Sequence, residues 1–186
     1  MSAEEVSPPR AAEVLSSIFL ATREMTQAMD EIVWAVNPQQ DTLDSLATYL
    51  GKYAQDFLEG TGLRCRLEMS VQLPNWRLEA EVRHNLFLAF KESLNNALRH
   101  AGATEVRISL TTNIHAFTIV VEDNGRGFTQ DPTQNAPSIP RPSTSRNGLA
   151  NMHHRLQQIG GQCEIQSAIG KGTRVEFLVP VNPATT

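Results

Sequence analysis

The chain has 186 residues, a formal net charge of −4 and 40% hydrophobic residues. This length suits one domain of about 140 residues with a helical lead-in, and the apolar content is sufficient for a packed core. A negative net charge argues against general nucleic-acid binding. No apolar stretch in the sequence approaches the roughly 20 residues that span a bilayer, so neither nucleic acid nor membrane is an expected partner of this segment.

The first fifty residues differ in composition from the rest, because all eleven glycines lie after residue 50. Residues 1–10 are expected to form a disordered start. Apolar residues at spacings near three, four and seven predict a helix over residues 11–36, which Pro38 stops. A long one-sided helix needs a packing partner, which is either its own domain or a second copy of the chain.

Both helices and strands are expected after Pro38. Asp41 is a good N-cap for a helix that runs to about Glu59, where Gly60 and Gly62 favour its end. Apolar periodicity and turn residues assign the other elements. The expected strands are 64–71, 105–111, 115–122, 162–167 and 174–179, and the expected helices are 78–101 and 148–159.

The expected helix over 78–101 carries chemically useful side chains on one face. Glu92, Asn96 and Arg99 lie at i, i+4 and i+7, opposite an apolar side that includes Leu94. A carboxylate, an amide and a guanidinium then point the same way, as a proton acceptor, an oxygen ligand for a hard cation and a phosphate donor. For this helix alone, a solvated polar face is the alternative.

Three glycine-containing segments follow. Asp123-Asn124-Gly125-Arg126-Gly127 comes after an apolar run, where glycine permits close approach of a ligand and an aspartate can accept a hydrogen bond from an exocyclic amine. Asn147-Gly148-Leu149 stands at an expected helix start, whose free N–H groups favour phosphate. Gly170-Lys171-Gly172-Thr173 lies between two expected strands. For the first and third segments, an ordinary turn is the alternative.

Taken in order, the four segments resemble the boxes of the GHKL ATPases, the fold shared by DNA gyrase and the sensor histidine kinases. Glu92 to Asn96 resembles the N box, Asp123-x-Gly125-x-Gly127 the G1 box, Gly148-Leu149 the G2 box and Gly170-x-Gly172-Thr173 the G3 box. The resemblance covers residues 40–183. It implies an α+β fold, a two-layer α/β sandwich (Bergerat fold) in which a mixed sheet packs on helices, preceded by a long helix. No Walker-type sequence occurs, so a P-loop site is not supported.

Within that family, the chain is most similar to the nitrate-sensor-like histidine kinases. The shared patterns are Glu92-x-x-x-Asn96-x-x-x-His100-Ala101, Gly148-Leu149-x-x-Met152-x-x-Arg155 and the segment from Glu31 to Pro38. The resemblance implies that residues 11–38 correspond to the second helix of the dimerisation and phosphotransfer unit. No histidine precedes His84, so the phosphoacceptor His-Asp motif is missing, and a fragment of a larger sensor kinase is the simplest explanation.

The resemblance also implies roles for individual residues and the cofactors ATP and Mg²⁺. Glu92 is the catalytic residue, which orients or deprotonates an attacking water or, in a kinase, assists transfer to a histidine. Asn96 holds Mg²⁺ through its amide oxygen, and Asp123 binds the adenine amino group. The ATP-binding positions are Asn96, Arg99, His100, Asp123, Gly125, Gly127, Gly148, Leu149, Gly170, Gly172 and Thr173.

Residues 129–147 hold four of the ten prolines together with serine, threonine and glutamine. This composition is typical of a mobile loop. Because the segment lies between the G1 and G2 boxes, where the family has its ATP lid, we expect it to be that lid. A surface insertion without function is the alternative.

The expected function is that of the ATP-binding catalytic domain of a two-component sensor histidine kinase, which donates the γ-phosphate to a histidine outside this chain. Its expected partners are the phosphoacceptor histidine helix of the parent kinase, a response regulator and a second copy paired through residues 11–38. The expected location of this domain is the cytoplasm, whether or not the parent kinase is membrane-anchored. An anti-sigma-type serine protein kinase and a non-catalytic nucleotide-binding module are the alternatives.

Overall fold

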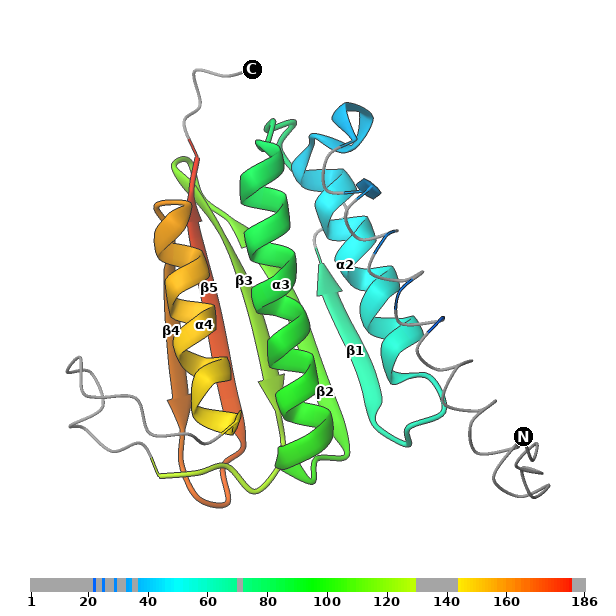
Figure 1. Cartoon of the computed structure of the whole chain (residues 1–186), viewed down its shortest axis with the longest axis vertical. Helices are drawn as coiled ribbons and strands as arrows, with labels where there is room; N and C mark the ends of the chain where they lie inside the picture. The colour runs from blue at the N-terminus through cyan, green and yellow to red at the C-terminus, as the bar shows by residue number, and fades with distance from the viewer. Residues whose placement is uncertain are drawn as a thin grey trace, which may run out of the picture.

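The computed structural model describes residues 37–69, 72–129 and 144–181, together with Thr22, Met25, Met29, Val33 and Trp34. In this part of the chain a five-stranded sheet carries three helices on one face (Figure 1). The helices are α2 (Leu43–Leu58), α3 (Ala80–Asn96) and α4 (Thr144–Gln158), with a short 3-10 helix η1 (Pro38–Gln40) and a π-helical turn η2 (Ala97–Ala101). The strands are β1 (Arg64–Met69), β2 (Glu105–Thr112), β3 (Ala116–Asp123), β4 (Gln162–Ser167) and β5 (Thr173–Pro180).

The sheet is mixed, with strand order β1-β2-β3-β5-β4. Only the β1–β2 pair is parallel, and the other pairs are antiparallel. A parallel pair needs a long crossover connection, which α3 provides between β1 and β2. The expected α+β class and the two-layer sandwich with a mixed sheet are therefore confirmed.

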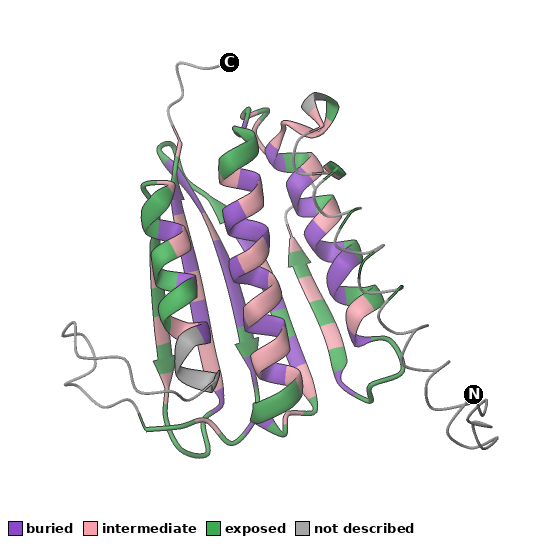
Figure 2. Ribbon diagram, viewed as in Figure 1, coloured by how far each residue is buried: buried purple, intermediate pink, exposed green. Residues whose placement is uncertain are grey.

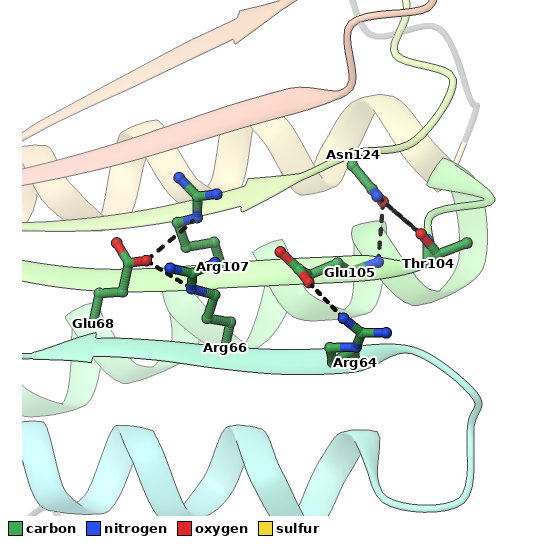
Figure 3. A network of polar contacts seen from close by, with 7 residues as sticks. All are labelled: Arg64, Arg66, Glu68, Thr104, Glu105, Arg107 and Asn124. Carbon is green, nitrogen blue, oxygen red and sulfur yellow. Dashed lines mark hydrogen bonds and ion pairs between the residues drawn. The ribbon is translucent and has the colours of Figure 1, made fainter.

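The core lies between the sheet and the helices (Figure 2). Val106, Ile108 and Leu110 alternate along β2 on the buried face, and Phe87 and Phe90 meet them from α3. The opposite face of the sheet is polar. There Glu68 Oε1 lies 2.8 Å from Arg66 Nε and 3.7 Å from Arg107 Nε, and Arg64 Nη1 lies 3.5 Å from Glu105 Oε2 (Figure 3). Exposed pairs of this kind contribute little to stability, so this face behaves as a solvated surface.

Helix α2 begins one residue later than the sequence indicates. Thr42, not Asp41, is its N-cap, and the Thr42 hydroxyl accepts a hydrogen bond from Ser45 N at 3.2 Å. Asp41 has other partners, because its carboxylate lies 3.4 Å from Arg77 Nη1 and its carbonyl accepts from Leu78 N. Asp41 thereby ties the start of α2 to the segment that leads into α3.

The five described residues before Asn37 are helical, as the apolar spacing predicts. Trp34 stacks on Tyr49 of α2 with ring centroids 3.8 Å apart, and the guanidinium carbon of Arg83 lies 5.9 Å from the centroid of the Trp34 ring. Of the two predicted packing partners for this segment, the chain's own domain is the one seen at Trp34. No helix in the described residues is both long enough and apolar enough to cross a membrane.

Candidate functional site

Asp123 is the last residue of β3 and is only 8% exposed. Its Oδ1 accepts hydrogen bonds from Gly125 N at 2.8 Å and from Thr173 N at 3.3 Å. Burial raises the pKa of the Asp123 carboxyl above its ordinary value, and these N–H groups oppose that shift. An ionised carboxylate only accepts hydrogen bonds, so this group selects a ligand that offers a donor, such as an amine.

The loop after Asp123 packs tightly against the chain's own backbone. A Cβ at Gly125 would overlap the Ala101 carbonyl oxygen, and a Cβ at Gly127, whose φ is +59°, would overlap the Ala168 carbonyl oxygen. Glycine is required at both positions because neighbouring loops approach so closely. The loop that contains the Asp-x-Gly-x-Gly sequence therefore packs between the end of η2 and the β4–β5 turn.

The β4–β5 turn completes this cluster beside Asp123. Gly172 has a φ of +75°, and a Cβ there would overlap the Asp123 carbonyl oxygen. Thr173 pairs with Asp123 in the sheet register. Gly170 has a φ of +76° and open space around it, and its N–H donates to the Arg126 carbonyl at 2.7 Å. Asp123, Gly125, Gly172 and Thr173 are thus brought together, while Gly170 serves the turn.

Ser167 also belongs to the cluster, and it is not among the site residues that the sequence predicts. Its hydroxyl oxygen accepts a hydrogen bond from Phe128 N at 2.9 Å, and its hydroxyl donates to the Gly172 carbonyl at 2.9 Å. The same oxygen lies 3.0 Å from Thr173 Oγ1. One signal in the sequence points to it. Ser167 occupies the half-buried series of β4 that contains Cys163 and Ile165, so it is a polar residue where the alternation favours an apolar one.

Gly148 is not at a helix start, which corrects the prediction. Helix α4 begins at Thr144, so Gly148 is its fifth residue and residues 144–147 of the expected lid are helical. Only the first four N–H groups of a helix lack an intrahelical partner, so the Gly148 N–H is not among the free donors. Gly148 instead faces Glu92, because a Cβ there would overlap Glu92 Oε1. The next residue, Leu149, packs against the core.

Helix α3 and helix α4 are also joined by a polar contact. Arg155 Nη1 donates to Asn85 Oδ1 at 3.3 Å, and Asn85 Nδ2 donates to the Glu81 carbonyl at 3.2 Å. Met152, one turn earlier, is fully buried. The pattern Gly148-Leu149-x-x-Met152-x-x-Arg155 thus marks the side of α4 that packs on α3 and the core.

Asn96 is the last residue of α3, and its Nδ2 is buried without a hydrogen-bond partner among the described residues. A buried donor normally has an acceptor, so this amide N–H2 group is suited to a ligand that offers an oxygen acceptor. Arg99 and His100 lie in η2 and are exposed. The helix continues to Ala101, where the sequence predicts its end, but its last five residues are π-helical. A π-helix has more residues per turn than an α-helix, so the α-helical spacing that would place Arg99 on the face of Glu92 does not apply to this turn.

The acidic and amide groups present suit a lightly ligated cation. The described residues contain no group of three or more His, Cys, Asp or Glu side chains that would hold a metal by themselves. Mg²⁺ retains several waters and is bound through few protein oxygens together with substrate phosphates. The amide of Asn96, one turn after Glu92, fits that requirement.

Comparisons with known proteins identify the family. The family model of histidine kinase-, DNA gyrase B- and HSP90-like ATPases matches residues 81–183, which is more than half of the chain. The sensor histidine kinase LiaS of Bacillus subtilis is 35% identical over 102 residues, covering 55% of this chain and 26% of that protein. The sensor protein VraS of Staphylococcus aureus is 26% identical over 133 residues, covering 72% of this chain and 36% of that protein.

Solved structures share the fold. The Acinetobacter baumannii histidine kinase AdeS has a TM-score of 0.61 at 14% identity and covers 96% of this chain and 87% of that one. The histidine kinase domain of the Erythrobacter litoralis EL346 blue-light activated kinase has a TM-score of 0.59 at 19% identity and covers 91% and 85%. The chain spans 26% to 36% of the length of the curated relatives named above. It belongs to the family of histidine kinase-, DNA gyrase B- and HSP90-like ATPases, and residues 81–183 form an ATPase domain of the kind found in sensor histidine kinases.

Proposed function

We propose that this chain is the ATP-binding catalytic domain of a two-component sensor histidine kinase of the nitrate-sensor-like subfamily, and that it transfers the γ-phosphate of ATP to a histidine outside these residues. The buried carboxylate of Asp123, fixed by the N–H groups of Gly125 and Thr173, is the observation that carries the proposal. It offers acceptors to an exocyclic amine, which adenine has at the position where guanine has a carbonyl oxygen.

The other roles follow from the placement of α3. Asn96 would hold Mg²⁺, which neutralises phosphate charge when bound, and Glu92 would orient or deprotonate the attacking group. Arg99 and His100 are exposed on η2 and would donate hydrogen bonds to the phosphate groups. The closely packed glycines Gly125 and Gly172, together with Thr173, would shape the pocket around the base.

The proposal extends to partners and location. The acceptor would be the phosphoacceptor histidine helix of the parent kinase, with a response regulator as the next acceptor of the phosphoryl group. Residues 11–38 would pair with a second copy, and the exposed Met25, Met29 and Val33, at helical spacing, supply an apolar side for that contact. Because ATP is available in the cytoplasm, this domain would be cytoplasmic whether or not the parent kinase is anchored in a membrane.

The isolated chain is expected to bind ATP without labelling itself on histidine. Phosphoryl transfer needs an acceptor in line with the γ-phosphate, and no histidine precedes His84. Incubation with radiolabelled ATP and a separate helical fragment that carries a His-Asp motif should place an acid-labile, base-stable label on that fragment.

The same assay separates the alternatives. An acid-labile, base-stable label on the chain alone would contradict the proposed division of roles. An acid-stable label on serine of a protein substrate would favour a serine kinase of the anti-sigma type. Tight ATP binding with no transfer to any acceptor would favour a non-catalytic nucleotide-binding module.

Of the expected lid, residues 129–143 are proposed as the ATP lid, on the basis of their composition and their place between the G1 and G2 boxes. Residues 144–147 belong to α4, and residues 130–143 lie outside the described residues. Amides in residues 130–143 should become protected from hydrogen exchange when ATP and Mg²⁺ are added, because the lid would close over the phosphates. The amides of β2 serve as the internal control and should be equally protected in both states. Equal protection of the lid with and without nucleotide would contradict this assignment.

A further inference from the structure

Asn124 lies between Asp123 and Gly125 and makes long-range contacts with its side chain. Its Oδ1 accepts hydrogen bonds from Thr104 N at 2.9 Å and from Glu105 N at 3.0 Å, and its Nδ2 donates to Thr104 Oγ1 at 2.9 Å (Figure 3). An Asn-Gly pair ordinarily marks a local turn, in which the asparagine bonds to its own backbone. Here the partners lie about twenty residues earlier, so the side chain acts as a tertiary link.

Backbone contacts run beside this link. Asn124 N donates to the Glu105 carbonyl at 3.2 Å, and Arg126 N donates to the Ala101 carbonyl at 2.8 Å. Ala101 is the last residue of η2, the turn that follows Asn96. The loop after Asp123 is therefore hydrogen-bonded to both ends of the segment that connects η2 to β2.

The link acts on Asp123 through one peptide group. Gly125 N, which holds Asp123 Oδ1 at 2.8 Å, belongs to the peptide between Asn124 and Gly125. Fixing the Asn124 side chain to residues 104 and 105 fixes the Cα from which that peptide extends. The direction of the Gly125 N–H, and hence the orientation of the carboxylate, then depends on Asn124.

We propose that Asn124 is a positioning residue that orients the Asp123 carboxylate toward the adenine base. It also connects the loop after Asp123 to the segment that follows α3 and η2. The proposal rests on the adenine-binding role of Asp123 in the proposed function. It assigns part of the base selectivity to a residue that need not touch the nucleotide.

Asn113 provides a matched control at the opposite end of β2 and β3. Its Oδ1 accepts from His115 N at 2.9 Å and from Ala116 N at 3.0 Å, so it also makes two bonds to backbone N–H groups. Asn113→Ala and Asn124→Ala should lower stability to urea by similar amounts. Only Asn124→Ala should weaken ATP binding, by about fivefold, with little change for GTP. Asn124→Asp, which keeps both acceptor bonds, should recover part of the ATP preference.

Amide exchange supplies a readout that needs no nucleotide. In the free chain, the Gly125 and Thr173 amides should exchange faster in Asn124→Ala than in Asn113→Ala, because both donate to Asp123 Oδ1. Unchanged exchange at these amides, or an unchanged ratio of ATP to GTP affinity in a folded Asn124→Ala, would overturn the proposal. If the unmodified chain binds neither nucleotide, the proposed function fails, and the exchange rates alone decide whether Asn124 positions Asp123.

Discussion

Replacing Asp123 with alanine is expected to lower the affinity for ATP at least tenfold. The substitution removes a buried carboxylate that would accept a hydrogen bond from the adenine amine, and hydrogen bonds to charged groups contribute about 1.5–3 kcal/mol. The affinity for GTP, which presents an acceptor at the same position, should not fall in parallel. Calorimetric titration of the chain and the variant with each nucleotide in the presence of Mg²⁺ measures both effects.

Glu122 is the natural control for this substitution. It precedes Asp123 in β3 but lies on the open face of the sheet, where its Oε2 is 3.8 Å from Arg174 Nη1. Glu122→Ala removes the same number of charges and should leave both nucleotide affinities unchanged. Equal affinities of the unmodified chain for ATP and GTP, or an Asp123→Ala chain that is folded and still prefers ATP, would disprove the assignment.

Introducing a methyl group at Gly148 is expected to reduce phosphoryl transfer to an added acceptor by about a hundredfold, because small displacements of a reacting group have effects of that order. The new Cβ would occupy the position of Glu92 Oε1, so either the carboxylate turns away or α4 moves. Because Glu92 Oε1 is the far end of a flexible side chain, turning the carboxylate away is the cheaper response, so the loss of unfolding free energy should stay at the low end of the about 1–3 kcal/mol that overpacking costs. Urea denaturation and the transfer assay together measure the two consequences.

Gly51 offers a matched control, since it also lies inside a helix. A Cβ at Gly51 would meet Leu67 Cδ1 at 3.3 Å, so the leucine side chain needs only a small adjustment, whereas Glu92 has to move at Gly148. Gly51→Ala should therefore be close to neutral, helped by the better helix propensity of alanine. The double variant Glu92→Ala/Gly148→Ala should regain most of the stability that Gly148→Ala loses, because the carboxylate is gone. Gly148→Ala with normal stability and normal transfer would show that the contact has no influence on Glu92.

Local sequence signals were sufficient for the elements and for their class. Burial alternates along β2 because successive residues point to opposite faces of the sheet, and this alternation can be recognised from consecutive residues. In β3 the consecutive apolar residues themselves predict a buried strand. Gly102, at a φ of +61°, ends η2 where the sequence places the end of the helix. Asp123 at a strand end was recognised for the same reason, since an apolar run followed by Asp-x-Gly is visible without knowledge of any partner.

Other features depend on contacts between distant segments, and the sequence does not show them. Ala97–Ala101 carry no residue that forbids an α-helix, yet they form a π-helical turn whose last carbonyl accepts from Arg126 N. Gly148 is needed because Glu92, from another helix, fills the space beside it. Ser167 and Asn124 hold the site through partners that the chain brings together only after folding.

Consecutive residues are therefore enough to predict the order of helices and strands and the family resemblance, and they suggest which side chains could accept a hydrogen bond from an amine or hold a cation. The π-helical turn over Ala97–Ala101, the start of α4 at Thr144 and the N–H groups that bond to Asp123 become apparent only in the folded chain. The physical reason is that periodicity and propensity act over a few residues, whereas close packing and shared hydrogen bonds depend on segments that are separated along the chain.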